Sequence, residues 1–324
     1  MQLGKVFKAA SVSFKKNRSK ILMFALSLAV LISAVYILFD VLLGVGLIFA
    51  ALLIFPLLVS VDIIAMKSVD NVVIENSDFY IGLKKYGTSF YLKIRTLIKG
   101  LIIALVAFII VALIGSMILM IRVAQENPQI LQGTVDVTTL YDTIGSLPWM
   151  EEALNYVSYA AFIAAFLCYF LFGYSNALSP FVCYQTRFPV DTALTLSKKY
   201  SEANKKFFRK FNFIFFLIFL PMVAIGVALN KVLLLANMAQ LPSYIISFFI
   251  SAFLIALYIF YYKIAYYHIY RHYFKEAVDD TFKKHMEKLM GIKKAEEVPL
   301  DISSGDEEIN PDDFNNDDNQ KTSE

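Results

Sequence analysis

One acidic residue, Asp62, stands well inside a long apolar segment of this 324-residue chain. A carboxylate at membrane depth is costly to bury, and such groups commonly serve proton or cation coupling. Asp62 lies near the end of its segment, so water or Lys67, five residues later, would neutralise it in a purely structural arrangement. Asp62 is therefore a candidate intramembrane site, with packing at the membrane interface as the alternative.

A second group of polar residues surrounds a proline further along the chain. Pro180 cannot donate a backbone hydrogen bond to the carbonyl of Asn176, so nearby Ser and Asn side chains or water must satisfy that carbonyl. The resulting kink should face protein or a wet cavity rather than lipid. Ser175, Asn176, Ser179 and Pro180 are therefore candidate site residues, and helix packing without a ligand is the alternative.

Two histidines have the spacing of metal ligands. His268 and His272 are four residues apart on one predicted helix face, but the next possible ligand on that face is Glu276. No metal site and no cofactor are predicted. The motifs of zinc proteases, serine hydrolases and phosphate-binding loops do not occur, and we expect no enzymatic activity.

The composition indicates an integral membrane protein. Apolar residues make up 58% of the chain and charged residues 18%, which excludes an ordinary water-soluble enzyme. The apolar residues form runs of about 18 or more, the length that a helix needs to cross a hydrocarbon core of roughly 30 Å. Six spans are predicted, at residues 21–39, 41–66, 97–121, 157–184, 211–235 and 244–267.

These spans predict one all-α membrane domain at residues 1–275. Only Asp40 separates the first two spans, and one helix through both would be too long for a membrane, so a tight hairpin is predicted at residues 40–44. A cytoplasmic amphipathic helix is predicted at residues 276–292. The acidic segment 293–324 is predicted to be a disordered tail.

Lysine and arginine predict the orientation of the spans. All 30 of these residues except Arg122 and Lys231 fall near the termini or on alternate connections. The positive-inside rule then places both termini in the cytoplasm. Such a surface predicts anionic lipid headgroups as partners, allows for a protein partner, and gives no reason to expect nucleic acid.

The outward connection before span four contains a predicted helix start. Ser146 is suited to cap a helix and Pro148 to occupy its first turn. Glu151 and Glu152 favour the positive end of the helix dipole. We interpret Trp149 as an anchor at the membrane interface.

Span six carries a regular stripe of tyrosines. Tyr258, Tyr262, Tyr266 and Tyr270 recur every four residues and reach deeper than an interfacial aromatic belt. Buried hydroxyl groups need hydrogen-bond partners. This face is predicted to pack against other helices or a ligand.

Two cytoplasmic connections share a pattern that indicates an internal repeat. Residues 78–95 and 191–210 each begin with an Asp suited to cap a helix, contain Lys-Lys-Tyr, and reach the next span eleven residues after that Tyr. Their apolar residues recur at helical spacing, which predicts helices on the membrane surface. Residues 3–16 resemble them weakly, so three units of surface helix, outward span and inward span are predicted. Topological bias towards Lys-rich flanks is the alternative.

This combination resembles a known type of bacterial membrane domain. Surface helices, Lys-rich flanks, and a proline beside the polar sequence Gly-Tyr-Ser-Asn at residues 173–176 are similar to the membrane domain attached to some glycerophosphodiester phosphodiesterases, and to stand-alone relatives of uncharacterised function. The resemblance covers residues 1–275 and lacks the catalytic barrel, so it does not imply that activity. With the short loops, it implies a bacterial plasma membrane.

The sequence predicts a non-enzymatic protein that organises lipid or a protein partner at the cytoplasmic membrane face. Lys84, Lys85, Lys198 and Lys199 form the candidate basic face for this role. A transporter of a small solute or lipid, using Asp62 and the polar residues near Pro180, is the main alternative. An intramembrane enzyme is the third hypothesis.

Overall fold

The computed structural model describes residues 2–43, 46–126, 147–236 and 239–289. Within these ranges the chain is helical, without a strand. The described residues up to Phe282 form one compact unit. Six helical segments are long and apolar enough to cross a membrane: Arg18–Leu38, Leu52–Asp70, Tyr86–Glu126, Met150–Thr186, Lys205–Leu235 and Pro242–Tyr273. The chain is an all-α protein with six candidate membrane spans, as predicted.

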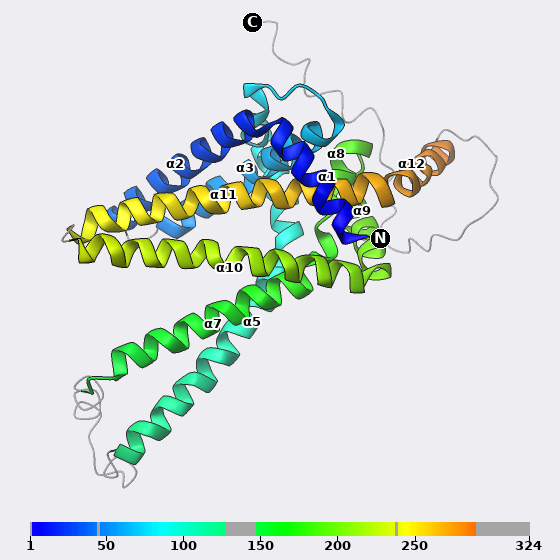
Figure 1. Ribbon diagram of the computed structural model, residues 1–324. Coiled ribbons are helices and arrows are strands. Elements are labelled where there is room, and N and C mark those ends of the chain that lie inside the picture. Colours follow the sequence, from blue (N-terminus) through cyan, green and yellow to red (C-terminus); the bar gives the residue numbers. More distant parts are fainter. Residues whose placement is uncertain (1, 44–45, 127–146, 237–238, 290–324) are drawn as a thin grey trace, which may run out of the picture. The chain divides into compact units, whose positions relative to one another are not determined.

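Long helices contain the candidate spans, and shorter helices precede, connect and follow them (Figure 1). The long helices are α2 (Arg18–Leu43), α3 (Gly46–Asp70), α5 (Tyr86–Glu126), α7 (Met150–Phe172), α10 (Lys205–Leu235) and α11 (Gln240–Tyr273). The shorter ones are α1 (Leu3–Lys16), η1 (Asn76–Tyr80), α4 (Ile81–Lys84), η3 (Gly173–Asn176), α8 (Ser179–Thr186), α9 (Val190–Ala203) and α12 (Lys275–Leu289). The predicted tail at residues 293–324 lies outside the described residues.

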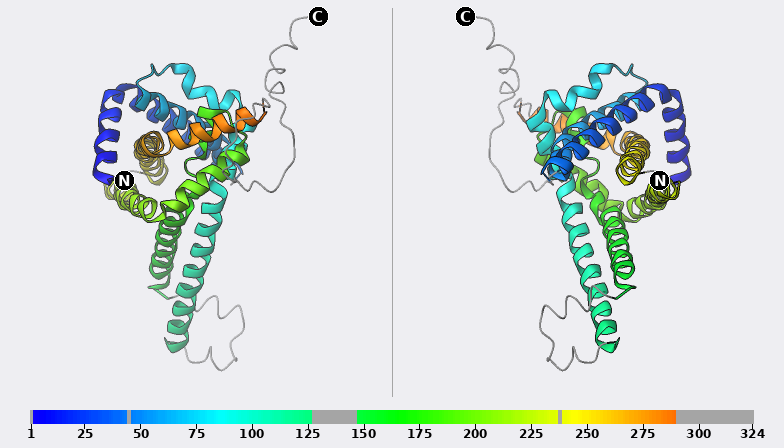
Figure 2. Two further views of the ribbon diagram at one scale, coloured as in Figure 1. Left: turned by 90° about the vertical axis from the view of Figure 1, so that its right-hand side faces the viewer. Right: turned by 90° about the vertical axis from the view of Figure 1, so that its left-hand side faces the viewer.

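Contacts between helices close the six spans into a ring. Consecutive spans pair, because α2 contacts α3, α5 contacts α7, and α10 contacts α11. Figure 2 shows α5 and α7 side by side along most of their length. The three pairs are joined by contacts of α3 with α5, of α7 with α10, and of α11 with α2, and α11 also contacts α3.

Each short helix that precedes a span pair packs on the pair before it. Helix α4 contacts α3, and α9 contacts α8 and η3. Helix α1, which begins the chain, contacts α11 of the last pair. On α1 the hydroxyl of Ser11 lies 3.0 Å from the hydroxyl of Tyr261, and the Phe7 ring stacks against both Phe211 and Phe215 of α10. The order of contacts is therefore cyclic.

The hairpin predicted at residues 40–44 begins too early in the sequence. Helix α2 continues to Leu43 and α3 begins at Gly46, so Asp40 lies inside α2. Residues 44–45, which separate the two helices in the sequence, lie outside the described residues. An acidic residue one turn from the end of a membrane helix lies near enough to the interface that it need not end the helix.

The first predicted surface helix was also wrong in extent. Residues 78–95 do not form one helix: α4 ends at Lys84, Lys85 leaves the helical conformation, and α5 then runs unbroken from Tyr86 to Glu126. The start of α5 packs into the bundle, where Ser89, Leu92 and Lys93 are buried. The buried face of this part of α5 is therefore not the predicted apolar stripe, because Tyr86 is exposed and Phe90 is half-buried.

Close backbone packing explains why the chain turns at α4. A Cβ atom at Gly82 would lie 1.8 Å from the backbone oxygen of Pro56, so only glycine allows this approach. The amide of Gly82 donates a hydrogen bond to Ser60 Oγ at 3.0 Å. Phe79 of η1 stacks on Phe24 of α2, with ring centroids 5.4 Å apart. These contacts fix η1 and α4 on the first span pair.

The start of the fourth span differs in part from its prediction. Helix α7 begins at Met150 with Trp149 as its N-cap and without a side-chain cap, while Glu151 and Glu152 lie in the first turn as expected. Ser146 lies outside the described residues. The Trp149 indole donates to Glu126 at 2.9 Å, and the Arg122 guanidinium lies 4.1 Å from the ring centre.

The tyrosine stripe of α11 is buried against α10, which confirms that this face packs against another helix. Tyr258 donates to the backbone oxygen of Phe215 at 3.1 Å. Tyr262 and Tyr266 both donate to Asn212 Oδ1, at 3.0 and 2.9 Å. Asn212 therefore satisfies two of the four hydroxyl groups. The fourth member, Tyr270, packs against Phe181 of α8, and its buried hydroxyl has no hydrogen-bond partner within the described residues.

Candidate functional site

Asp62 meets two lysines in the interior of the span bundle. Its carboxylate on α3 is fully buried, and Lys93 on α5 donates a hydrogen bond to Oδ2. Nζ of Lys263 on α11 lies 3.1 Å from Oδ1. Lys93 is 1% exposed and Lys263 is 9% exposed. These three residues, one from each span pair, form the ionic cluster.

The ionic cluster carries two formal positive charges and one negative charge. A buried ion is unfavourable unless it is paired, and removing one partner leaves an uncompensated charge. The cluster therefore joins α3, α5 and α11 only while its members keep their charges. Sequence analysis counted Lys93 and Lys263 among the cytoplasmic basic residues and missed their meeting with Asp62, because no sequence spacing brings residues from three separate spans together.

Lys67 is not the partner of Asp62. The ammonium of Lys67 lies 2.7 Å from Oδ1 of Asp78, and Asp78 also accepts a hydrogen bond from the Glu75 amide. Five residues along an α-helix turn the side chain about 140° around the axis, so Lys67 points away from the face that carries Asp62. Lys67 and Asp78 instead fix the turn after α3.

The fourth span is broken where the sequence predicted a kink. Helix α7 ends at Phe172, a 3₁₀ turn covers Gly173–Asn176, and α8 begins at Ser179 with Pro180 in its first turn. The Ser179 hydroxyl donates to the carbonyl of Asn176 at 2.7 Å. Predicted span 157–184 is therefore two helices, because Pro180 removes a donor and the polar side chains satisfy the freed backbone.

Other helices complete the hydrogen bonds of this break. Ser197 of α9 donates to the carbonyl of Ser175 at 2.9 Å and accepts from the amide of Leu178 at 3.2 Å. Thr96 of α5 lies 3.0 Å from the Ser179 hydroxyl. Thr96 is one helical turn from Lys93, so α5 carries both the ionic cluster and a contact to the broken span.

Asn176 and Ser175 also contact α5. The side-chain amide of Asn176 lies 3.4 Å from the Arg95 backbone oxygen, and Lys99 Nζ donates to Ser175 Oγ at 3.2 Å. The four candidate residues of this segment therefore lie together, whereas no hydrogen bond or ion pair joins them directly to Asp62 within the described chain. Sequence analysis missed Ser197, because neither its residue type nor its spacing within α9 distinguishes it from the neighbouring polar residues.

The candidate basic face consists of exposed lysines on short helices. Lys84, Lys85, Lys198 and Lys199 are all exposed. The opposite sides of these helices are packed inward, through Gly82 on α4 and Ala193 and Leu196 on α9. The structure leaves all four ammonium groups accessible and gives none of them an ion pair within the described residues.

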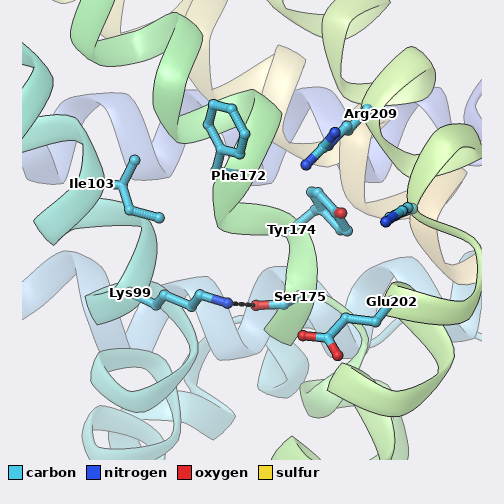
Figure 3. A pocket seen from close by; sticks show the side chains of 8 residues that line it. Lys99, Ile103, Phe172, Tyr174, Ser175, Glu202 and Arg209 are labelled. Atoms are coloured by element: carbon cyan, nitrogen blue, oxygen red, sulfur yellow. Dashed lines mark hydrogen bonds between the residues drawn. The ribbon is translucent and has the colours of Figure 1, made fainter.

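A cavity of about 400 Å³ lies beside the broken span (Figure 3). Its charged side chains come from α5, the end of α9 and the start of α10, and we call it the basic pocket. The lining of the basic pocket includes Lys99, Phe172, Ser175, Glu202, Lys205 and Arg209. Sequence analysis gave these cations only a topological role, although Lys99 falls inside the predicted span 97–121, which was a usable signal.

The two histidines make no metal site with other residues of the described chain. Ser13 Oγ lies 3.0 Å from Nε2 of His268, and the rings of His268 and His272 are stacked with centroids 5.9 Å apart. A group of three or more metal-ligating side chains does not occur in the described ranges. His268 instead joins α11 to α1.

Comparison with protein-family models, curated proteins and solved structures finds no match to this chain. The functional conclusions below therefore depend on the residues and their geometry.

Proposed function

We propose that this chain is a non-enzymatic multi-pass membrane protein that organises anionic lipid, or a protein partner, at the cytoplasmic membrane face. The observation that carries the proposal is the exposure of two lysine pairs, Lys84–Lys85 and Lys198–Lys199, on short helices whose other sides are anchored in the bundle. Because the backbone of these helices is already fixed by packing, the lysines point outward without a further loss of backbone conformational entropy. Basic groups at a membrane surface attract anionic headgroups.

The orientation in this proposal follows from charge. Both termini lie in the cytoplasm, because the basic residues collect on one set of connections. The assignment to a bacterial plasma membrane is supported by the short loops and by the resemblance given above. Two membrane spans separate α4 from α9 in the sequence, so both lysine pairs lie on the same side of the membrane. The Arg95 guanidinium lies 2.7 Å from Asp191 Oδ1, which brings the starts of α5 and α9 together.

The proposal includes three repeated units arranged in a cycle. The units are α1 to α3, η1 to α8, and α9 to α11, each a short helical segment followed by two spans. Support comes from the cyclic contacts, in which each short helix packs on the preceding unit and α1 packs on the last. The two Lys-Lys-Tyr sequences occupy different positions in their units, since Tyr86 begins α5 whereas Tyr200 lies inside α9.

Lipid enrichment around the reconstituted protein tests this function. The full chain would be extracted in native-lipid nanodiscs, and the ratio of anionic to zwitterionic lipid measured by mass spectrometry. We expect enrichment that falls when Lys84, Lys85, Lys198 and Lys199 are all changed to Gln, and that persists when the same four are changed to Arg. Unchanged lipid ratios and unchanged co-purifying proteins in the Gln variant would refute the proposal.

Transport is the second candidate function, and two features favour it. The ionic cluster places charged side chains in the bundle interior. At the break before α8, side chains take the place of regular helical hydrogen-bond partners for some backbone groups. Proteoliposome flux of small solutes and of fluorescent lipid would test it. Flux that is lost in Asn176→Ala and in Asp62→Asn protein that keeps its helical circular dichroism supports transport, and flux insensitive to both substitutions removes its basis.

A further inference from the structure

The basic pocket holds an excess of positive charge. Lys99, Lys205 and Arg209 face one carboxylate, Glu202, which gives a formal charge of +2. None of these four side chains forms an ion pair within the described ranges. Unpaired cations that line one cavity attract an anion, and a doubly charged anion would neutralise this set.

Two of the cations are held in place by neighbours. Lys99 donates to the hydroxyl of Ser175, which is itself 3% exposed and lies in the 3₁₀ turn between α7 and α8. The guanidinium of Arg209 lies 5.2 Å from the centre of the Phe172 ring. Figure 3 shows Lys99 and Arg209 on opposite sides of the turn that carries Tyr174 and Ser175. Arg and Lys positioned in this way offer charge-assisted hydrogen bonds to phosphate oxygens.

The surroundings of the pocket suit a lipid better than a free solute. Ile103, one turn beyond Lys99 on α5, and Phe172, which is 41% exposed, also line the cavity. On the face of α5 that carries Lys99 and Ile103, the exposed apolar surface continues with Val106 and Ile110, which are each 51% exposed. An acyl chain attached to a bound headgroup would lie on this apolar surface, whereas a free phosphate would leave it unused.

We propose that the basic pocket binds one lipid whose headgroup is a phosphate monoester, of the phosphatidate type. Such a group carries close to two negative charges at neutral pH, whereas the phosphodiester of phosphatidylglycerol carries one. Arg209 and Lys99 bind the phosphate oxygens, and Lys205 adds a third positive charge. Glu202 limits the net charge of the pocket. This inference rests on the proposed function only in requiring that the protein meet anionic lipid at this membrane face.

Native mass spectrometry of the full chain tests the site directly. Purified protein would be incubated with dioleoyl phosphatidate, phosphatidylglycerol or phosphatidylcholine, and retained lipid counted per chain. We expect one phosphatidate per chain, retained more strongly than phosphatidylglycerol. Arg209→Gln and Lys99→Gln should each weaken retention about tenfold, the loss expected for a charge-assisted hydrogen bond. Lys206→Gln, an exposed neighbour that does not line the pocket, is the matched control and should behave as the unaltered protein.

Glu202→Gln provides a test in the opposite direction. Removing this carboxylate raises the formal charge of the pocket to +3, so phosphatidate retention should increase. Loss of retention in Glu202→Gln, or equal retention in Arg209→Gln and Lys206→Gln, would overturn the site. Equal retention of phosphatidylglycerol would overturn the phosphate-monoester preference. Displacement of the lipid by inorganic phosphate at matched concentration would show that the site takes free phosphate instead.

The two proposals fail in distinguishable ways. The variant with Gln at 84, 85, 198 and 199 changes no residue that lines the pocket, so it should keep its single phosphatidate while losing bulk anionic enrichment. Pocket variants should keep the bulk enrichment. If the variant with four Gln substitutions lost its bound phosphatidate and the pocket variants lost the bulk anionic enrichment, both assignments of residues would be refuted.

Discussion

Asp62 on α3 and Lys93 on α5 form an ion pair in which neither side chain is more than 1% exposed. The pair joins the first span pair to the second, and Lys263 on α11 extends it to the third. Ion pairs therefore join α3, α5 and α11 at the point where these three helices meet inside the apolar bundle. We expect the ionic cluster to favour this one arrangement of helices, because alternative packings would leave the charges unpaired.

Removing one member of the ionic cluster should destabilise the protein strongly. Asp62→Asn leaves two buried ammonium groups without their carboxylate, and we expect a loss of about 3–5 kcal/mol in the free energy of unfolding. The double variant Asp62→Leu with Lys93→Met should be less destabilised than Asp62→Asn, because it leaves fewer buried charges unpaired. Unfolding in detergent would be followed by helical circular dichroism. Asp191→Asn, at an exposed ion pair, is the control and should change little.

Gly82 should not tolerate a larger side chain. A Cβ atom there would lie 1.8 Å from the Pro56 oxygen and 2.7 Å from its carbonyl carbon, and backbone atoms cannot move aside as a flexible side chain can. Gly82→Ala should cost at least about 1–3 kcal/mol through overpacking. Gly87→Ala is the matched control, since its Cβ would meet nothing within 4 Å. Equal thermal midpoints for the two variants would contradict the close approach of α4 to α3.

Tyr86 should stabilise α3 only while Pro56 is present. Proline has no amide hydrogen, so the carbonyl of Leu52 loses its helical partner, and the Tyr86 hydroxyl donates to it at 3.0 Å. Tyr86→Phe should cost about 0.5–1.5 kcal/mol in the unaltered background. In a Pro56→Ala background the restored amide can bond Leu52, and the same substitution should cost little. A double-mutant cycle without coupling would contradict this explanation.

Sequence patterns predicted the parts of this fold that depend on local composition. The number of spans, the fold class and the buried tyrosine stripe follow from apolar runs and from the need of hydroxyl groups for partners. The proline near residue 180 correctly marked a discontinuity in span four, because a missing donor is a local property.

Features that depend on contacts between distant segments could not be predicted. Asp62 was recognised as unusual, yet its partners Lys93 and Lys263 lie on spans that only tertiary packing brings together. The end of α4 depends on Gly82 meeting Pro56, and helical periodicity alone extended the surface helix through it. Charge counting also treated buried and exposed lysines alike, although Lys93 and Lys84 have opposite environments.

Asn212 should be the polar residue on which the α10–α11 contact depends. Its Oδ1 atom accepts hydrogen bonds from Tyr262 and Tyr266, and the residue is 1% exposed. Asn212→Leu leaves both hydroxyls without this acceptor and should cost about 1–3 kcal/mol for each hydroxyl left unsatisfied.

The matched variants separate this hydrogen bonding from loss of packing. Tyr262→Phe alone should be nearly neutral, because Tyr266 continues to satisfy Asn212. Adding Tyr262→Phe and Tyr266→Phe to Asn212→Leu should recover most of the lost stability, since no unpaired hydroxyl then remains in this set. Thermal unfolding of the four proteins in one detergent would measure the recovery. A triple variant no more stable than Asn212→Leu would mean that shape at position 212, and not its acceptor oxygen, holds α10 against α11.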